Sequence, residues 1–139
     1  MFNLSETTAN WEKLGKWVVA PAGLPWISQG SRLQVGKNVR MAKTAFLDKF
    51  VILADNCAIE GFAFIGANCY IGEHTVIADS ARVGRGTRIN NAVLVDSLAS
   101  IGIYCVLEEY SHIYQNVVIG DFVIVNELEI VIDHQLVSN

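Results

Sequence analysis

The sequence has little proline, little charge and no long uninterrupted apolar run. Of its 139 residues only two are proline, Pro21 and Pro25, and only 17% are charged. No run of eighteen apolar residues exists, which argues against a membrane-spanning helix. The first ten residues also lack the basic start and apolar stretch of a secretory signal. These absences predict a cytoplasmic protein without a membrane segment.

Cysteine is also scarce, and its count is odd. The chain has three cysteines, Cys57, Cys69 and Cys105. In a chain without a secretory signal, reduced thiols are the expected state. We therefore expect no disulfide framework and interpret the cysteines first as small apolar core residues.

Basic residues are absent from the last third of the chain, so the charge is polarised. Residues 1–50 carry a net charge of +4, residues 51–90 carry −1, and residues 91–139 carry −7 with no Lys or Arg. Because no basic face runs along the whole chain, a nucleic-acid partner is not expected. This uneven distribution of charge concerns how the protein associates with other molecules rather than how it folds.

What the sequence does have is a repeat of six residues. Every sixth residue from Val35 is aliphatic or Met, and the residue four positions later is small or β-branched at all but two places, Glu129 and Gln135. The aliphatic series consists of Val35, Met41, Leu47, Leu53, Ile59, Ile65, Ile71, Ile77, Val83, Ile89, Val95, Ile101, Leu107, Ile113, Ile119, Val125, Val131 and Val137.

A period of six fits neither a single α-helix nor a single strand. It fits short strands joined by tight corners, with one large and one small residue per side filling a narrow interior. The residue after each aliphatic is often Gly, Asn or Asp, as at Gly66, Gly72 and Asn90. Because these types tolerate left-handed backbone, we expect the corner strain there. The repeat thus predicts a parallel β-helix.

The hexads Ile65-Gly66-Ala67-Asn68-Cys69-Tyr70 and Ile71-Gly72-Glu73-His74-Thr75-Val76 resemble the bacterial transferase hexapeptide repeat. The resemblance covers about three quarters of the chain. It implies an all-β fold: a single-stranded left-handed parallel β-helix with three hexads per coil and about six coils. We assign residues 33–139 to this β-helix and residues 1–32 to an N-terminal cap segment.

The two ends of the predicted solenoid differ. Trp11, Leu14 and Val18 have helical spacing, so we expect a short helix there, ended by the prolines, that covers the first coil. The C-terminal end shows no such cap. Glu129 and Gln135 fall at inward positions, where a buried charge is costly. We therefore expect the last coil to be loose or covered by a protein partner.

Residues eighteen apart stack in columns, and the most apolar outward columns predict an interface. Members of the family are usually trimers packed side by side, so the resemblance implies a homotrimer through these columns. The alternatives are that the N-terminal segment folds over them, or that they are ordinary exposed surface. The predicted interface residues are Phe50, Ile52, Tyr70, Tyr104, Val106, Phe122 and Ile124.

Histidine is the expected catalytic group, since family acyltransferases use one to deprotonate a hydroxyl or amine acceptor. His74, His112 and His134 all fall at outward positions of the hexad. His74 lies mid-solenoid beside Glu73 and is the first candidate for the base, followed by His112. The alternative for either is a solvent-facing residue of the repeat.

The resemblance also implies a coenzyme A thioester as acyl donor. Arg82, Arg85 and Arg88 form a basic cluster that would meet its phosphates, or else serve solubility or subunit salt bridges. No metal is expected. Zinc carbonic anhydrases share the fold, but their pair of histidines five residues apart is missing, and His74 and His112 lie about 9.6 Å apart by strand spacing.

Two functions from different classes remain open. One is an acyltransferase, with His74 or His112 as base. The other is a non-catalytic scaffold or assembly protein, which the unbroken repeat and the charge polarity favour. A basic and an acidic end attract each other, and a bare coil edge can pair with another chain. No insertion interrupts the hexads, so no lid over a site is expected.

Overall fold

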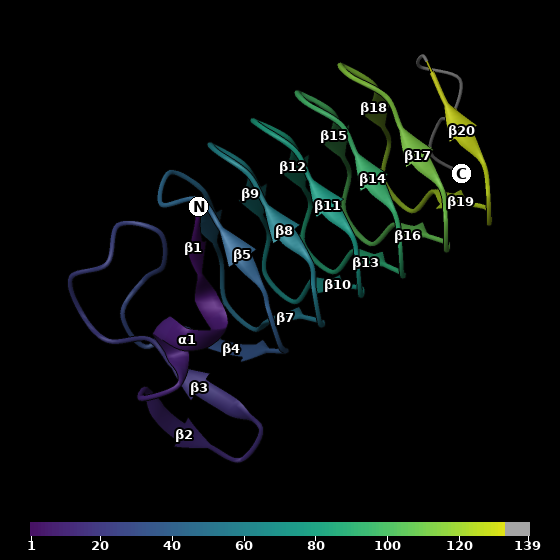
Figure 1. The fold of residues 1–139 in the computed structure, drawn as a ribbon. Coiled ribbons are helices and arrows are strands. Elements are labelled where there is room, and N and C mark those ends of the chain that lie inside the picture. Colours follow the sequence, from purple (N-terminus) through teal and green to yellow (C-terminus); the bar gives the residue numbers. More distant parts are fainter. Residues whose placement is uncertain (133–139) are drawn as a thin grey trace.

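The computed structural model describes residues 1–132, and their backbone winds into a β-helix of three sheets (Figure 1). Tyr70 pairs in parallel register with Ile52 on one side and with Arg88 on the other, so one coil takes eighteen residues. The coils advance from left to right in Figure 1. Along each coil the chain passes from the lower sheet to the near sheet and then to the far sheet, which is a left-handed winding. The predicted fold class is confirmed.

Each sheet is built from one short strand per coil. Sheet A contains β5 (Arg40–Met41), β8 (Ala58–Ile59), β11 (Val76–Ile77), β14 (Leu94–Val95), β17 (His112–Ile113) and β20 (Ile130–Val131). Sheet B contains β4 (Arg32–Val35), β7 (Val51–Leu53), β10 (Tyr70–Ile71), β13 (Arg88–Ile89), β16 (Val106–Leu107) and β19 (Ile124–Val125). Sheet C contains β6 (Phe46–Leu47), β9 (Phe64–Ile65), β12 (Arg82–Val83), β15 (Ser100–Ile101) and β18 (Val118–Ile119).

The N-terminal segment forms one backbone pairing with the first solenoid strand of each sheet. β1 (Phe2–Asn3) pairs antiparallel with β5, β3 (Trp17–Val19) pairs antiparallel with β4, and Ile27 bridges Leu47 of β6. Helix α1 (Leu4–Thr8) follows β1, and Asn3 caps it by accepting a hydrogen bond from the Glu6 N–H. The first coil is therefore covered on all three sides, as a solenoid end requires.

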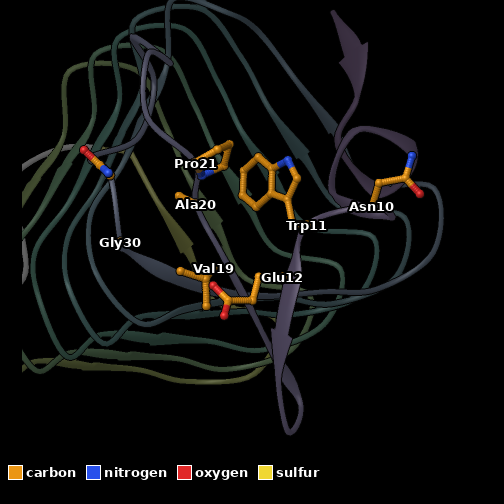
Figure 2. A pocket seen from close by; sticks show the side chains of 8 residues that line it. Asn10, Trp11, Glu12, Val19, Ala20, Pro21 and Gly30 are labelled. Carbon is orange, nitrogen blue, oxygen red and sulfur yellow. The ribbon is translucent and has the colours of Figure 1, made fainter.

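The predicted position of the cap helix was wrong. The only helix within residues 1–132 is α1, whereas Trp11, Leu14 and Val18 lie in and beside a hairpin of β2 (Glu12–Leu14) and β3. Gly15 has a φ of +63° at the first position of the two-residue turn, which a glycine adopts without strain. The free edge of sheet B binds this hairpin, and that tertiary pairing overrides the helical spacing. Figure 2 shows Glu12 and Val19, which pair across it.

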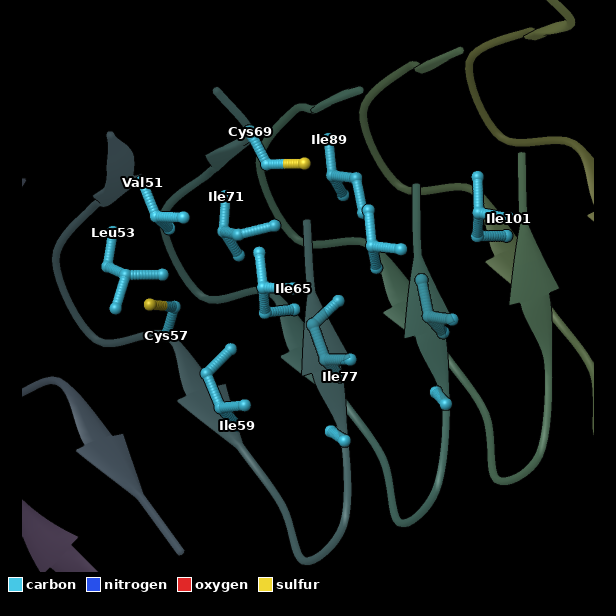
Figure 3. Close-up of a cluster of buried hydrophobic side chains, with 14 of the residues drawn as sticks. Val51, Leu53, Cys57, Ile59, Ile65, Cys69, Ile71, Ile77, Ile89 and Ile101 are labelled. Atoms are coloured by element: carbon cyan, nitrogen blue, oxygen red, sulfur yellow. The ribbon is translucent and has the colours of Figure 1, made fainter. Parts of the chain in front are cut away.

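The interior is filled by the two periodic columns of the repeat. The aliphatic residues from Met41 to Val131 are all buried, Val35 at the first coil is half-buried, and Val137 lies outside the described residues. Figure 3 shows Cys57 and Cys69 among Leu53, Ile59 and Ile71, as the small partners of these large side chains. Burying an aliphatic side chain contributes about 1.5–3 kcal/mol, so this column is the main source of stability.

The corner strain lies two residues later than the sequence indicated. The third residue after the aliphatic, not the first, has positive φ, and it is often bulky: Phe50, Tyr104 and Phe122 have φ of 60°, 53° and 60°. At most of these corners the backbone N–H of the positive-φ residue donates to a carbonyl of the preceding coil, as from Tyr104 to Arg85 and from Phe122 to Ile103, both at 2.9 Å. That hydrogen bond, with the side chain directed outward, holds a conformation that L-residues otherwise avoid.

The glycines after the aliphatic residues have a different reason, which is close approach between coils. A Cβ on Gly66 would lie 2.7 Å from the backbone nitrogen of Arg85 in the next coil. A Cβ on Gly84 would meet the carbonyl of Gly102 at 2.5 Å. Neither glycine has a positive φ. The absence of a side chain, rather than backbone freedom, is what these positions require.

Polar side chains satisfy the corner amides from one coil to the next. Asp55 accepts from the Lys37 N–H at 2.8 Å, and Asp79 and Asp121 accept from the N–H groups of the coils before them. These three acids thus have a structural role in addition to their charge. Each bond gives a corner N–H group a hydrogen-bond partner within the chain.

Glu129 resolves the problem of a charge at an inward position. Its side chain is half-buried, and its carboxylate accepts a hydrogen bond from the Asn126 N–H at 2.9 Å. The chain therefore folds the carboxylate back onto its own corner instead of placing it in the core. Gln135, the other exception to the small-residue pattern, lies outside the described residues.

Thr87 tests the contribution of the interior polar bonds. Its hydroxyl donates to Gly102 O at 2.9 Å and accepts from the Cys105 N–H at 3.1 Å, both in the next coil. Thr87→Val keeps the side-chain shape but leaves both groups unpaired, so the free energy of unfolding should fall by about 1–3 kcal/mol. Guanidinium unfolding followed by circular dichroism measures this. Ser100→Ala, on the outward face of sheet C, is the control, and equal unfolding midpoints for the two variants would contradict the prediction.

Candidate functional site

His74, the first candidate for a catalytic base, lies at an exposed corner. It precedes β11 and has a φ of +58°, and its backbone N–H donates to Asp55 O at 3.1 Å. The neighbouring Glu73 uses its backbone N–H to bind the Asn91 side chain. Within residues 1–132 no carboxylate lies within 4.0 Å of the His74 ring as an ion-pair partner. The structure gives this residue an exposed position but no orienting group.

His112, the second candidate, has such a group. It belongs to β17 on the outward face of sheet A, and its Nε2 lies 3.6 Å from Asp96 Oδ2. The two side chains are 28% and 31% exposed, and Nε2 itself is shielded from solvent and makes no hydrogen bond within the described residues. The Tyr114 ring packs on the imidazole with centroids 4.2 Å apart. The imidazole is therefore held by a carboxylate at one side and an aromatic ring at another.

Sequence reasoning missed Asp96 as a partner of His112. Asp96 lies two residues beyond Leu94, and Leu94 is the residue that pairs with His112 across the coils. The eighteen-residue register alone therefore places Asp96 diagonally next to the histidine. The register is the signal for their proximity, whereas the contact itself depends on the conformations of the two side chains.

The surface around His112 is apolar. In its column on sheet A lie Val76 and Leu94, both half-buried, and Ile130, which is 58% exposed. Ile132, at the end of the described chain, is also 58% exposed. The imidazole and its carboxylate neighbour therefore lie on a largely apolar part of sheet A.

The three arginines of the predicted phosphate site lie around one corner of one coil. Arg82 is on sheet C, Arg88 is on sheet B, and Arg85 is between them. The guanidinium carbon of Arg82 lies 4.7 Å from the ring centre of Phe64. That of Arg88 lies 4.2 Å from the Tyr70 ring, and that of Arg85 lies 5.7 Å from the Tyr104 ring. All three are exposed, and within residues 1–132 none is paired with a carboxylate. Their charge therefore remains open to an anion from outside the chain.

The predicted apolar interface divides into two parts. At its N-terminal end, Trp17 of the hairpin packs edge-on against Phe50 with ring centroids 5.6 Å apart, so the cap covers that residue in part and leaves it 39% exposed. At the other end the Tyr104 and Phe122 rings stack at 5.8 Å and remain 51% and 55% exposed. Ile124 is 55% exposed. Ile52, Tyr70 and Val106 are half-buried.

The search for a metal site and for cavities covers the described part of the chain. Within residues 1–132 no group of three His, Cys, Asp or Glu side chains is close enough to hold a metal ion. No helix in that range is long and apolar enough to cross a membrane. Two cavities are lined by residues of the cap and first coils, and neither contains a histidine or arginine. His134 lies outside the described residues.

Comparison with known proteins identifies no family for the chain. No protein-family model matches, and no curated protein sequence matches. Among solved structures, LpxA from Acinetobacter baumannii is similar with a TM-score of 0.35 and 15% sequence identity. The alignment covers 86% of this chain and 66% of LpxA, so this chain spans less than two thirds of that protein. The repeat, register and winding described above define the chain as a hexapeptide-repeat β-helix.

The cysteines are placed as core residues and not as nucleophiles. Burial raises the pKa of the Cys57 thiol to about 12 and that of Cys69 to about 11, and it also raises the pKa of Cys105. Cys69 and Cys105 donate their S–H groups to Gly84 O and Gly120 O of the next coil. Protonated, enclosed thiols are poor nucleophiles.

We expect the native protein to be almost unreactive toward the thiol reagent DTNB at about pH 8, because the thiolate forms only as the pH approaches the raised pKa values. Unfolding in guanidinium should expose all three thiols at once. Absorbance of the released thionitrobenzoate measures both states. A stoichiometric, fast reaction of the native protein would contradict the assignment.

Proposed function

We propose that this chain is a subunit of a hexapeptide-type acyltransferase, with His112 as the general base. The observation that carries the proposal is the pair formed by His112 and Asp96. Of the two histidines in the described part of the chain, only His112 has a carboxylate within 4.0 Å. A base oriented by a carboxylate is the arrangement that acyl transfer to a hydroxyl or amine needs.

The roles of the side chains follow from their positions. Asp96 faces Nε2, favours the tautomer with its proton there, and stabilises the imidazolium that forms. Nδ1 then removes the proton from the acceptor hydroxyl or amine and returns it to the departing thiolate. Tyr114 limits rotation of the imidazole ring. Apo histidine–carboxylate contacts are often longer than 3.2 Å and shorten when substrate binds.

A coenzyme A thioester, when bound, would supply the activated acyl group. Arg82, Arg85 and Arg88 fit its phosphates in charge and exposure, since none is neutralised by a described carboxylate. They lie on a different side of the β-helix from His112, so a complete site needs two subunits. We therefore propose a homotrimer in which the exposed Tyr104, Phe122 and Ile124 contribute to the boundary.

An acyl-coenzyme A at millimolar concentration should raise the melting temperature of the protein, because a ligand that binds only the folded state stabilises it. Transfer to an amine or alcohol acceptor, followed by release of free thiol, should fall about 10²–10⁴-fold in His112→Ala. Asp96→Asn should lower the rate while leaving the thermal shift intact.

His74→Ala is the discriminating variant. Loss of transfer in His74→Ala with full activity in His112→Ala would move the catalytic role to His74. The absence of any thermal shift together with the absence of thiol release would contradict the acyltransferase proposal itself.

A non-catalytic scaffold is the second candidate, and one observation favours it. The last coils expose Tyr104, Phe122, Ile124, Leu128 and Ile130, each more than half exposed, on a part of the chain without Lys or Arg. Such a surface fits association with another chain. The first coil and cap carry the opposite charge.

Light scattering separates the two candidates. A scaffold that assembles through opposite charges should show a molar mass that rises with protein concentration and falls as salt is raised, because salt screens exposed charges. A discrete trimer with the same mass at low and high salt would contradict this second candidate.

A further inference from the structure

The N-terminal cap contains a cavity that the proposed function does not use (Figure 2). Its volume is about 390 Å³, within the range of small-molecule sites. Trp11, Val19 and Pro21 form an apolar wall, and Asn10, Glu12 and Gln29 supply polar groups. The cavity lies at the first coil, whereas His112 belongs to β17, the fourth strand after β5 in sheet A.

The walls of the cavity are fixed before any ligand arrives. The Trp11 indole stacks on Trp26 with centroids 5.7 Å apart and an interplanar angle of 17°, and Trp26 is buried at 4% exposure. The floor is closed by two backbone hydrogen bonds, from Ala20 N–H to Ser31 O at 2.8 Å and from Gly30 N–H to Ala20 O at 2.9 Å. A preformed site loses little conformational entropy on binding.

Glu12 gives the cavity its charge. It pairs with Val19 across the hairpin, so both side chains lie on the same face. No Lys or Arg lines the cavity, and within residues 1–132 no cation lies within 4.0 Å of the Glu12 carboxylate. The adjacent Lys13 instead donates its ammonium group to Ala9 O at 2.9 Å. The carboxylate is thus available to a cation from outside the chain.

We propose that this cavity binds a small organic ammonium ion with an apolar body, such as an arylalkylamine. The ammonium group donates hydrogen bonds to the Glu12 carboxylate and to the side-chain oxygens of Asn10 or Gln29. The hydrocarbon part packs on the Trp11 and Pro21 rings, and the cation gains from the indole. An anion would meet Glu12 with no compensating positive charge. The proposal is independent of acyl transfer at His112.

Calorimetric titration with 2-phenylethylammonium tests this proposal on the full chain, with neutral 2-phenylethanol as the matched ligand. We expect saturable binding of the amine with a dissociation constant below about 1 mM and at least about tenfold weaker binding of the alcohol. Tryptophan fluorescence should change along the same binding curve, because Trp11 lines the cavity.

Two variants assign the binding to this cavity. Glu12→Gln, at an exposed position, should weaken the amine about tenfold while the alcohol is unaffected. Trp11→Leu should weaken the amine about threefold, and circular dichroism verifies its folding. Glu6→Gln, which removes a carboxylate of α1 outside the cavity, is the control and should bind as the parent does.

Three results would overturn the proposal. They are no saturable binding of the amine, equal affinity for amine and alcohol, and unchanged amine affinity in Glu12→Gln. Should Trp11→Leu fail to fold, the comparison of Glu12→Gln with Glu6→Gln still decides, since both substitutions are on the surface. None of these results bears on acyl transfer, so the two proposals fail separately.

Discussion

The alignment of each coil with the next, eighteen residues later, is the constraint on which the rest of this structure depends. It pairs strands that contain only two to four residues, too short to be stable alone. It brings each large aliphatic side chain onto the one below it, and it allows Asp55, Asp79 and Thr87 to bind backbone groups of a neighbouring coil. A shift by one residue would turn the interior column outward, so the register is enforced by the whole core.

The fold was predictable because the repeat encodes this register directly. The interior residues, the parallel pairing and the presence of an N-terminal cap follow from the periodicity and the family resemblance. The cap's own structure was not predictable in the same way. Trp11, Leu14 and Val18 have helical spacing, yet they belong to a hairpin because the open edge of sheet B offers backbone partners. Position alone likewise could not show that the corner strain falls on Tyr104 and Phe122 rather than on the glycines.

The candidate site was predictable only in part. The outward placement of His74 and His112 follows from the hexad, and so does the position of the three arginines on one coil. The contact between His112 and Asp96 depends on side-chain conformation and on Tyr114, which periodicity does not report. The cavity at Trp11 and Glu12 depends on the hairpin, and a sequence interpreted as a helix there conceals it.

The cap pairs with the first solenoid strand of all three sheets, and this pairing limits where the chain can gain or lose a coil. The N-terminal end is closed to growth, because a new coil there would have to displace β1, β3 and Ile27 together. Inside the solenoid, the gain or loss of one whole coil would keep the interior columns in register and the same type of hydrogen bond between coils. A change of length by eighteen residues would therefore preserve the fold, and one coil added between the cap and β14 would move His112 one strand spacing away from the cap while keeping its neighbours across the sheet.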